Sequence, residues 1–242
     1  MSDIQINIEN KTYRTSSKPT ISRFSLSLKF NEFICLVGPS GCGKTTLLNI
    51  IAGLDHDFIG DILVGRQKAT PKIGYVFQNP RLLPWRTVRE NIELVLDKQQ
   101  SSDLVDALLN IMQLTQVQHK YPEQLSLGMS RRVSIIRAFA VNSELLLMDE
   151  PFVSLDGPSA RQVRDQLMML WQQRPHTVLF VTHDLREAIA LADRLIFLSA
   201  TPMQVVSEII VPITRSLRQN EEVIELFRQQ LFQNYPEIKQ YL

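Results

Sequence analysis

Residues 38–45 read Gly-Pro-Ser-Gly-Cys-Gly-Lys-Thr, a complete match to the phosphate-binding motif G-x-x-x-x-G-K-[ST]. Its glycines let the backbone curl so that amide hydrogens point inward at a polyphosphate. Lys44 is expected to reach the β- and γ-phosphates, and the Thr45 hydroxyl to bind the accompanying Mg²⁺. The residues expected to contact the nucleotide here are Gly38, Pro39, Ser40, Gly41, Cys42, Gly43, Lys44, Thr45 and Thr46.

The sequence on either side of the motif supplies the strand and the helix that such a loop requires. An apolar run at 33–37 precedes it and indicates a buried strand, and an apolar run at 46–52 follows it as a helix. A helix N-terminus beneath the loop would add partial positive charge under the phosphates. A chance glycine-rich turn would not have this setting, so we predict a site for a nucleoside triphosphate.

Composition limits the class of protein. The chain has 242 residues, 44% of them hydrophobic, which suits one α/β domain with a small inserted subdomain. Its 26 Lys and Arg nearly balance its 25 Asp and Glu, so charge gives no reason to expect a nucleic-acid partner. The first residues lack the pattern of a secretory signal, and no apolar run is long enough to span a bilayer. Cys35 and Cys42 are expected to be reduced thiols.

Strand-like and helix-like stretches alternate along the chain, as a largely parallel α/β sheet requires. The other strands are predicted at 61–64, 73–77, 145–148, 177–182, 194–198 and 204–209, the last two as a hairpin. Helix-favouring sequence fills 87–121, including a helix at 102–112, and the tail from 221 is also helical. We divide the chain into 1–86 (N-terminal core), 87–140 (inserted helical subdomain), 141–220 (rest of the core) and 221–242 (tail), with one domain over about 4–220.

Two carboxylates follow the apolar run at 145–148. Four large apolar residues in a row indicate a strand buried on both faces, and the carboxyl end of such a strand adjoins the ligand site in a doubly wound sheet. Asp149 is expected to hold the Mg²⁺ shell, and Glu150 to polarise the water that attacks the γ-phosphate. Taken alone, Asp-Glu-Pro could instead be a solvated turn, a reading that the phosphate loop makes weaker.

Five further elements occur in a characteristic order. They are Tyr13, Gln78 after the Tyr75-Val76-Phe77 strand, Leu125-Ser126-Leu127-Gly128-Met129 ahead of a helix at 131–138, Ser154-Leu155-Asp156, and His183 after the 177–182 strand. With the phosphate loop and the acidic pair, this order resembles the ATP-binding-cassette (ABC) ATPases from about Tyr13 to Val211. The resemblance implies a P-loop NTPase of the ABC type, with a mainly parallel core sheet, an antiparallel β portion and an inserted helical subdomain.

The resemblance also implies roles for these residues. Tyr13 would stack on adenine, Gln78 would contact Mg²⁺ and sense a membrane subunit, and His183 would be the switch histidine. Ser126 and Gly128 would form an anion site at a helix N-terminus that completes the ATP site of a second copy, with Asp156 in the adjoining D-loop. The chain would then act as a homodimer. Leu127 stands where the family usually has the first of two glycines.

The segment 77–92, and above all Leu82-Leu83-Pro84-Trp85, is similar to cassettes of nitrate, sulfonate and taurine importers. Trp85 would either dock a membrane subunit or anchor the loop from inside. The resemblance implies an importer ATPase that uses ATP and Mg²⁺ at the cytoplasmic face of the inner membrane, peripherally bound to permease subunits and served by an extracytoplasmic solute-binding protein. Alternatives are a soluble ABC ATPase without a transport role, or a regulatory cassette without hydrolysis, which Glu150 and His183 disfavour. The transported solute cannot be read from an ATPase subunit.

Overall fold

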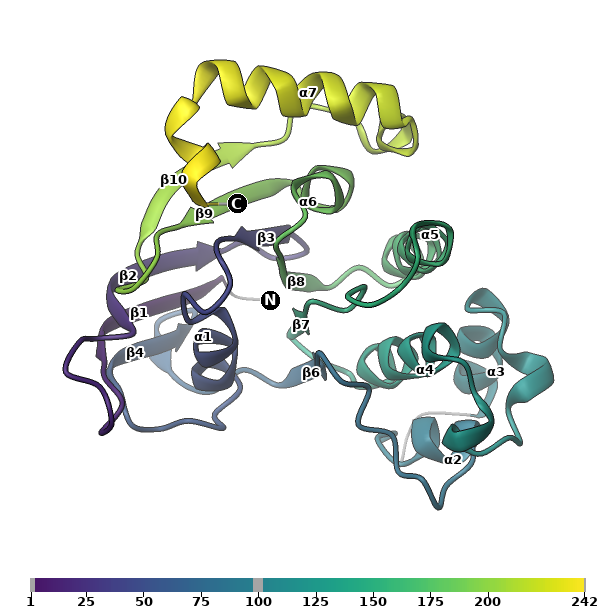
Figure 1. The fold of residues 1–242 in the computed structure, drawn as a ribbon. Coiled ribbons are helices and arrows are strands. Elements are labelled where there is room, and N and C mark those ends of the chain that lie inside the picture. Colours follow the sequence, from purple (N-terminus) through teal and green to yellow (C-terminus); the bar gives the residue numbers. More distant parts are fainter. Residues whose placement is uncertain (1–2, 98–101, 242) are drawn as a thin grey trace. The chain divides into compact units, whose positions relative to one another are not determined.

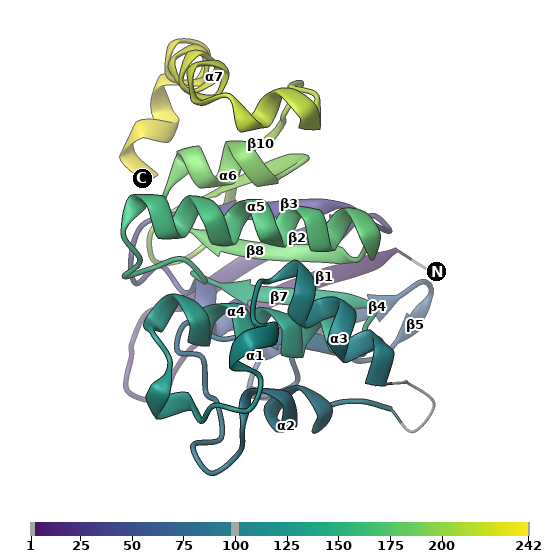
Figure 2. The same ribbon diagram turned by 90° about the vertical axis from the view of Figure 1, so that its right-hand side faces the viewer.

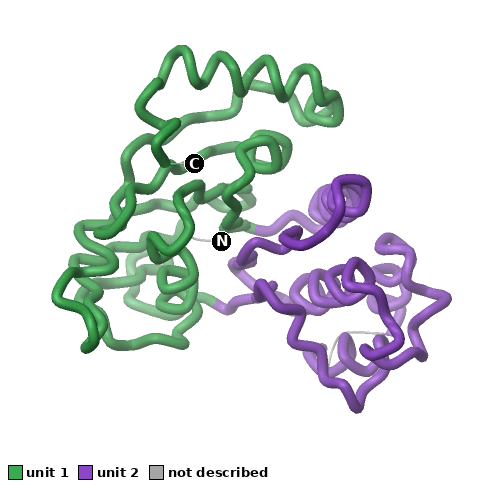
Figure 3. Tube along the Cα trace, viewed as in Figure 1, with its two compact units in different colours: residues 1–71, 177–242 green, residues 72–176 purple. Residues whose placement is uncertain are grey.

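The computed structural model describes residues 3–97 and 102–241 and divides into two compact units (Figures 1 and 3). Unit 1 consists of Met1–Pro71 and Thr177–Leu242, and unit 2 of Lys72–His176. The sequence-based segments 1–86, 87–140 and 221–242 each include a few residues outside the described ranges. That four-part division remains a prediction.

Unit 1 contains an antiparallel sheet in which one face carries the apolar side chains. Its strand order is β2-β1-β4-β5, with β1 (Ile4–Lys11), β2 (Ile21–Leu28), β4 (Ile59–Val64) and β5 (Gln67–Lys68). Buried and exposed residues alternate along β1 and β2, because successive side chains of a strand point to opposite faces. Ile6 pairs with Leu26 on one side and Ile62 on the other, which places apolar side chains in register across the sheet.

The second group of strands in unit 1 carries the phosphate motif. It has the order β10-β9-β3-β8, with β3 (Phe33–Val37), β8 (Thr177–Thr182), β9 (Arg194–Leu198) and β10 (Val205–Ile210). β3 is parallel to both β8 and β9, and β10 pairs antiparallel with β9, which confirms the expected hairpin. Every residue of β3, β8 and β9 is buried, as the apolar runs predict for central parallel strands.

Helices cover these strands. In unit 1 they are α1 (Lys44–Ile51), α6 (Leu185–Leu191), α7 (Glu221–Asn234) and the short 3₁₀ helices η3 (Arg215–Gln219) and η4 (Pro236–Tyr241). α6 contacts both β3 and α7 and lies between them in Figures 1 and 2. The helical tail expected from residue 221 is confirmed by α7.

Unit 2 has two parallel strands, β6 (Ile73–Val76) and β7 (Leu145–Asp149). Its helices are α2 (Val88–Glu93), α3 (Ser102–Ile111), α4 (Leu127–Ala140), α5 (Gly157–Gln173) and the 3₁₀ turns Thr115–Val117 and Pro122–Gln124. The expected helix at 102–112 is confirmed, whereas α5 was not located from the sequence. Over the described residues of both units, no helix combines the length and apolarity needed to cross a bilayer.

Candidate nucleotide-binding and catalytic site

The phosphate loop lies between the end of β3 and the start of α1. α1 begins at Lys44, two residues before the helix start predicted at residue 46. Gly41 and Gly43 have φ angles of +77° and +110°, which residues with a side chain rarely adopt. A Cβ atom on Gly43 would also lie 2.8 Å from Thr20 Cγ2. The motif therefore needs glycine at 43 for two reasons, one of backbone conformation and one of space.

Lys44 places its ammonium group at the loop. The side chain is buried, and Nζ donates to the carbonyl oxygens of Gly38 at 2.8 Å and Pro39 at 2.9 Å. Thr45 follows on the exposed side of the first turn of α1. That turn is wholly described and holds no acidic residue, so the partial positive charge of the helix N-terminus is not neutralised there. The loop combines a cationic side chain with a helix N-terminus that no acidic residue neutralises, which suits a polyphosphate.

Cys42 supports the loop from within. Its thiol is buried, and its Sγ atom would lie 3.3 Å from a Cβ atom on Gly38. Burial raises the pKa of the Cys42 thiol, and burial likewise raises the pKa of Cys35 in β3. Both are free cysteines, and with raised pKa values their thiols stay protonated near neutral pH. They act as small packing residues of this region.

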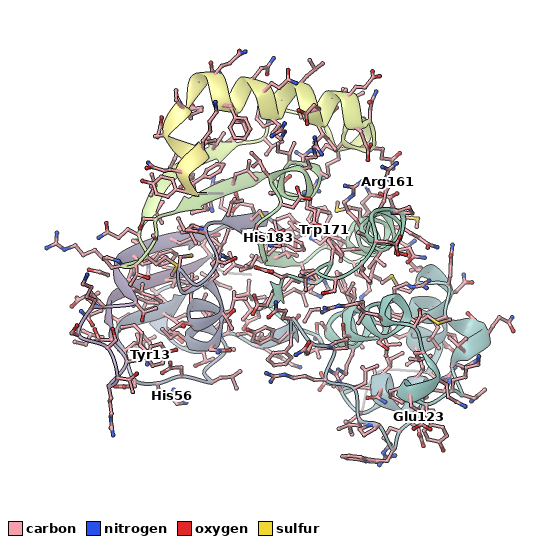
Figure 4. All side chains as sticks on the ribbon, viewed as in Figure 1. Tyr13, His56, Glu123, Arg161, Trp171 and His183 are labelled. Carbon is pink, nitrogen blue, oxygen red and sulfur yellow. The ribbon has the colours of Figure 1, made fainter. Side chains whose placement is uncertain are left out.

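Tyr13 lies beside the start of α1. It sits on the loop after β1, and its hydroxyl is 3.0 Å from Thr46 Oγ1 (Figure 4). The side chain is 41% exposed. Unit 1 thus brings the predicted aromatic residue next to the helix that carries Lys44 and Thr45.

His183 lies at the same edge of the sheet as the phosphate loop. Val37, the last residue of β3, pairs in parallel with Thr182, the last residue of β8. Gly38 and His183 therefore both follow the carboxyl ends of neighbouring strands. The Thr182 hydroxyl accepts from Asp184 N at 3.0 Å and donates to Glu187 Oε2 at 2.7 Å, which fixes the turn around His183.

In unit 2, two parallel strands likewise place Gln78 and the acidic pair at the same edge of the sheet. Val76 pairs in parallel with Met148, so Gln78 and Glu150 occupy equivalent positions beyond the ends of β6 and β7. Asp149 is buried as the last residue of β7. Glu150 is half-buried and has a φ of +44°, an uncommon value for a residue with a side chain. Such backbone strain is often found at functional positions.

Ser126 caps the N-terminus of α4, and its side chain accepts from Met129 N at 3.3 Å. The helix begins at Leu127 and not near Arg131, because this cap allows the first turn to form over 127–129. The predicted loop is therefore largely a helix N-terminus. Leu127 is exposed, and the nearest described atom to a Cβ on Gly128 is Leu155 Cδ2 at 3.9 Å, so the surface above this turn is open.

Asp156 caps the N-terminus of α5. Its carboxylate accepts from Ser159 N at 3.0 Å and from Ser159 Oγ at 2.7 Å. These hydrogen bonds hold the pKa of Asp156 below its ordinary value. Ser154, two residues earlier, has a φ of +66°. The structure gives Asp156 a capping role, and its contact with nucleotide remains a prediction.

Two arginines of α4 were missed by the sequence reasoning. Arg131 is buried and donates to the carbonyls of Gln78, Phe77 (3.5 Å) and Val153 (3.3 Å). Arg137 donates to the carbonyls of Arg81 and Pro80, both at 2.9 Å. Burial lowers the pKa of both guanidinium groups. We call these the arginine–carbonyl contacts; they hold the segments after β6 and β7 against α4.

The role of Asn91 was also not predicted from the sequence. Its side chain is fully buried, accepts from Leu83 N at 2.8 Å and donates to the carbonyls of Leu83, Arg86 and Thr87 at 3.0–3.2 Å. It therefore shapes the loop that presents Trp85, whose side chain is 69% exposed. The alternative in which Trp85 anchors the loop from inside is wrong. Nothing in the local sequence identifies an amide that satisfies backbone groups several residues away.

A metal ion at this site would depend on oxygen donors. The described residues contain no group of three or more His, Cys, Asp or Glu side chains placed to hold a metal. Thr45 and Asp149 each offer an oxygen, and hard cations such as Mg²⁺ prefer oxygen ligands completed by water and phosphate. These donor types suit a Mg²⁺ ion, and the ligand set of Thr45, Gln78 and Asp149 remains a prediction. Thr45 lies in unit 1, and Asp149 and Gln78 lie in unit 2.

Comparison with known proteins agrees with this chemistry. A family profile described as ABC transporter matches residues 21–153. The chain is 38% identical to the aliphatic sulfonates import ATP-binding protein SsuB of Bacillus cereus, over 96% of this chain and 95% of that protein. It is 38% identical to the nitrate import ATP-binding protein NrtD of Synechococcus elongatus, over 89% and 83% of the two chains.

A solved structure shows the same fold with products bound. The dimeric post-hydrolysis state of the ATP-binding cassette MJ0796, bound to ADP and Pi, superposes with a TM-score of 0.75 at 29% identity, covering 87% of this chain and all of that one. The expected mainly parallel core sheet with an antiparallel portion is confirmed. The phosphate loop, the acidic strand end and these matches together show that the chain belongs to the ABC transporter family, as a cassette that binds and hydrolyses ATP.

Proposed function

We propose that this chain is the ATP-hydrolysing subunit of an importer for a small solute of the sulfonate, taurine or nitrate type. The observation that carries the proposal is an intact phosphate loop within a chain that matches import ATP-binding proteins at 38% identity over most of its length. Solute specificity in such a system would reside in partner subunits, because an ATPase has no contact with the cargo.

Nucleotide binding is assigned mainly to unit 1. The loop amides and Lys44 would bind the phosphates, and the exposed ring of Tyr13 would stack on adenine. Thr45, Gln78 and Asp149 would hold Mg²⁺, with Asp149 acting through water. When bound, Mg²⁺ neutralises charge that develops on the β- and γ-phosphate oxygens.

Hydrolysis is assigned to groups at the two strand edges. The Glu150 carboxylate would orient the attacking water by accepting a hydrogen bond from it, and the residue directly follows buried Asp149 at the end of β7. His183, held in a turn by Thr182 and Asp184, would contact the γ-phosphate from the edge of unit 1. Both residues argue for a cassette that hydrolyses ATP over a regulatory one.

A homodimer would complete each site. Ser126 and Gly128 present a helix N-terminus whose surface is open, and the first turn of α4 has no acidic residue among its described positions. Such a terminus binds an anion, and in a head-to-tail dimer it would receive the γ-phosphate held by the other copy. Asp156 would lie in the adjoining D-loop. Leu127 is exposed on the same turn, so its side chain would lie near the interface with the other copy.

The exposed Trp85 loop supports a membrane partner. A large aromatic side chain held outward on a rigidly bonded loop is typical of a docking surface for another protein. We assign this surface to a helix of a permease subunit. The chain would then lie peripherally at the cytoplasmic face of the membrane, with a solute-binding protein on the other side.

Growth experiments test this proposal. A strain that lacks this chain should fail to use at least one of an aliphatic sulfonate, taurine or nitrate as sole sulfur or nitrogen source. The wild-type gene should restore growth and a Glu150→Gln gene should not. An active ATPase whose loss leaves all three uptakes intact would favour a soluble ABC ATPase. Restored growth with Glu150→Gln would favour a regulatory cassette.

A further inference from the structure

Lys11, the last residue of β1, carries a buried charge that the chemistry above does not use. Its side chain is 2% exposed, and Nζ donates to Asp55 Oδ1 at 2.8 Å and to the Asp57 carbonyl at 2.7 Å. A buried ammonium is stable only when its donors are satisfied. Both acceptors lie on the segment after α1, so Lys11 joins the end of β1 to that segment.

The remaining side of the ammonium faces an aromatic ring. Lys11 Nζ lies 4.6 Å from the centroid of the Tyr13 ring, within the range of a cation–π interaction. An ammonium has three N–H donors, and two of them point to the aspartate oxygens. Tyr13 is also held at its hydroxyl, 3.0 Å from Thr46 Oγ1. In Figure 4, Tyr13 and His56, the residue between the two aspartates, lie on the same side of unit 1.

These contacts restrain the ring, and Tyr13 remains partly exposed. One face of Tyr13 is covered by Lys11, while the side chain as a whole is 41% exposed. The Lys11 backbone adds to this, because its carbonyl accepts from Thr20 N at 2.7 Å and closes the loop that bears Tyr13. The Thr20 side chain in turn lies against Gly43 of the phosphate loop. The plane of the ring is thus set relative to the loop that binds phosphate.

We propose that Lys11 is a positioning residue for the nucleotide base, holding the Tyr13 ring from behind so that a purine can stack on its open face. The inference rests on the proposed function, in which Tyr13 stacks on adenine. Lys11 would contact neither phosphate nor base, because its ammonium is engaged by Asp55, Asp57 and the Tyr13 ring. Its effect is confined to the part of the binding free energy that the base contributes, since an unfixed ring must be ordered when the ligand binds.

The contribution of the base to the binding free energy can be measured by comparing ADP with inorganic pyrophosphate. Both ligands carry a diphosphate that would fill the phosphate loop and neither is expected to be hydrolysed, but only ADP carries adenosine. Calorimetry on the full chain with Mg²⁺ gives the ratio of the two dissociation constants. Lys11→Met should weaken ADP binding roughly 3- to 30-fold, the range of a cation–π contact and an ordered ring, with pyrophosphate binding within about twofold. Lys11→Arg, which keeps a cation over the ring, should restore most of the loss.

Lys68 offers a control for removing a lysine of the same unit, because its exposed side chain pairs with Asp61. Lys68→Met should change neither ligand. If Lys11→Met weakens ADP and pyrophosphate equally, Lys11 only stabilises the fold and the inference is overturned. If Tyr13→Ala lowers the ADP-to-pyrophosphate preference but Lys11→Met does not, the inference fails while the role of Tyr13 stands. If Tyr13→Ala leaves that preference unchanged, both fail. Should Lys11→Met not fold, Asp55→Asn, which removes the charge that orients Lys11, must show the selective loss.

Discussion

In unit 1 the phosphate loop is shaped by its own residues, whereas in unit 2 the segments that carry Gln78 and Glu150 are held by side chains from elsewhere. Gly41 and Gly43 adopt positive φ angles, and Lys44 bonds to carbonyls of its own loop. By contrast, Arg131 reaches carbonyls 53 and 22 residues away. A self-shaped loop can be recognised from eight consecutive residues, and one held at a distance cannot.

The comparison also separates binding from catalysis. The phosphate loop of unit 1 supplies donors for phosphate from its own residues, so ATP binding should be less sensitive than turnover to changes in unit 2. The residues of unit 2 depend on the arginine–carbonyl contacts, so turnover should be sensitive to changes that never touch a nucleotide. The following experiments test this separation, from the largest expected effect to the smallest.

Glu150→Gln should leave ATP affinity within a few fold and lower turnover roughly 10²- to 10⁴-fold, because an amide cannot polarise water as a carboxylate does. A fluorescent ATP analogue reports affinity, and phosphate release reports turnover. Glu144→Gln, before the other end of β7, is the matched control and should be nearly silent. If Glu150→Gln hydrolyses ATP at close to the wild-type rate, Glu150 does not polarise the attacking water.

Ser126→Arg should lower turnover by roughly 10²-fold, the cost of losing a donor to the transferred group, and should block ATP-dependent dimer formation. Size-exclusion chromatography with ATP and EDTA reports the dimer. Ser130→Arg adds the same bulk and charge one turn along α4 and is expected to have a weaker effect. A Ser126→Arg chain that still dimerises and hydrolyses normally would contradict the head-to-tail arrangement.

Gly43→Ala should weaken ATP binding about 10- to 100-fold, because an alanine at that φ is strained by roughly 1–2 kcal/mol and also contacts Thr20. Gly41→Ala is the control, since it has a positive φ but no described atom within 4 Å of the added Cβ. Its loss should be smaller. Equal losses would mean that the contact with Thr20 has no energetic weight. Equilibrium titration with ATP in EDTA measures both.

Arg131→Met should lower kcat about 3- to 30-fold with little change in ATP affinity, and lower the free energy of unfolding by about 1–3 kcal/mol through unsatisfied carbonyls. Trp171→Phe, on α5 of the same unit, removes the bond from the indole N–H to the His176 carbonyl and should reduce stability without the fall in kcat. Steady-state kinetics and urea unfolding separate the two effects. An identical kcat loss in both variants would show that Arg131 acts through general stability alone.

Trp85→Ala should change the ATPase rate of the isolated chain by less than about twofold, because an exposed side chain away from contacts contributes little to the fold. Solute uptake in cells should fall much more. Parallel assays of purified ATPase and of uptake measure the difference, with Tyr121→Ala as an exposed aromatic control in unit 2. Normal uptake in the Trp85 variant would exclude this surface as the permease contact.

The same contrast explains what the sequence could predict. β3, α1 and the loop between them were located because the signal is local, and β7 and β8 because buried parallel strands form continuous apolar runs. α5 was missed although Val163, Leu167, Leu170 and Trp171 have helical spacing and Asp156 supplies a cap. The alternation in β1 and β2 was also overlooked. Arg131, Asn91 and Lys11 could not be assigned, since their partners are set by tertiary folding.

The buried amide of Asn91 has a mechanical consequence. Residues 83–87 are joined by four hydrogen bonds to a single side chain on α2, so the loop has low compliance. A force applied to the indole of Trp85 cannot be absorbed by bending of the loop, because any bend would break several of these bonds together. Displacement of the loop is therefore expected to be passed to α2 through Asn91.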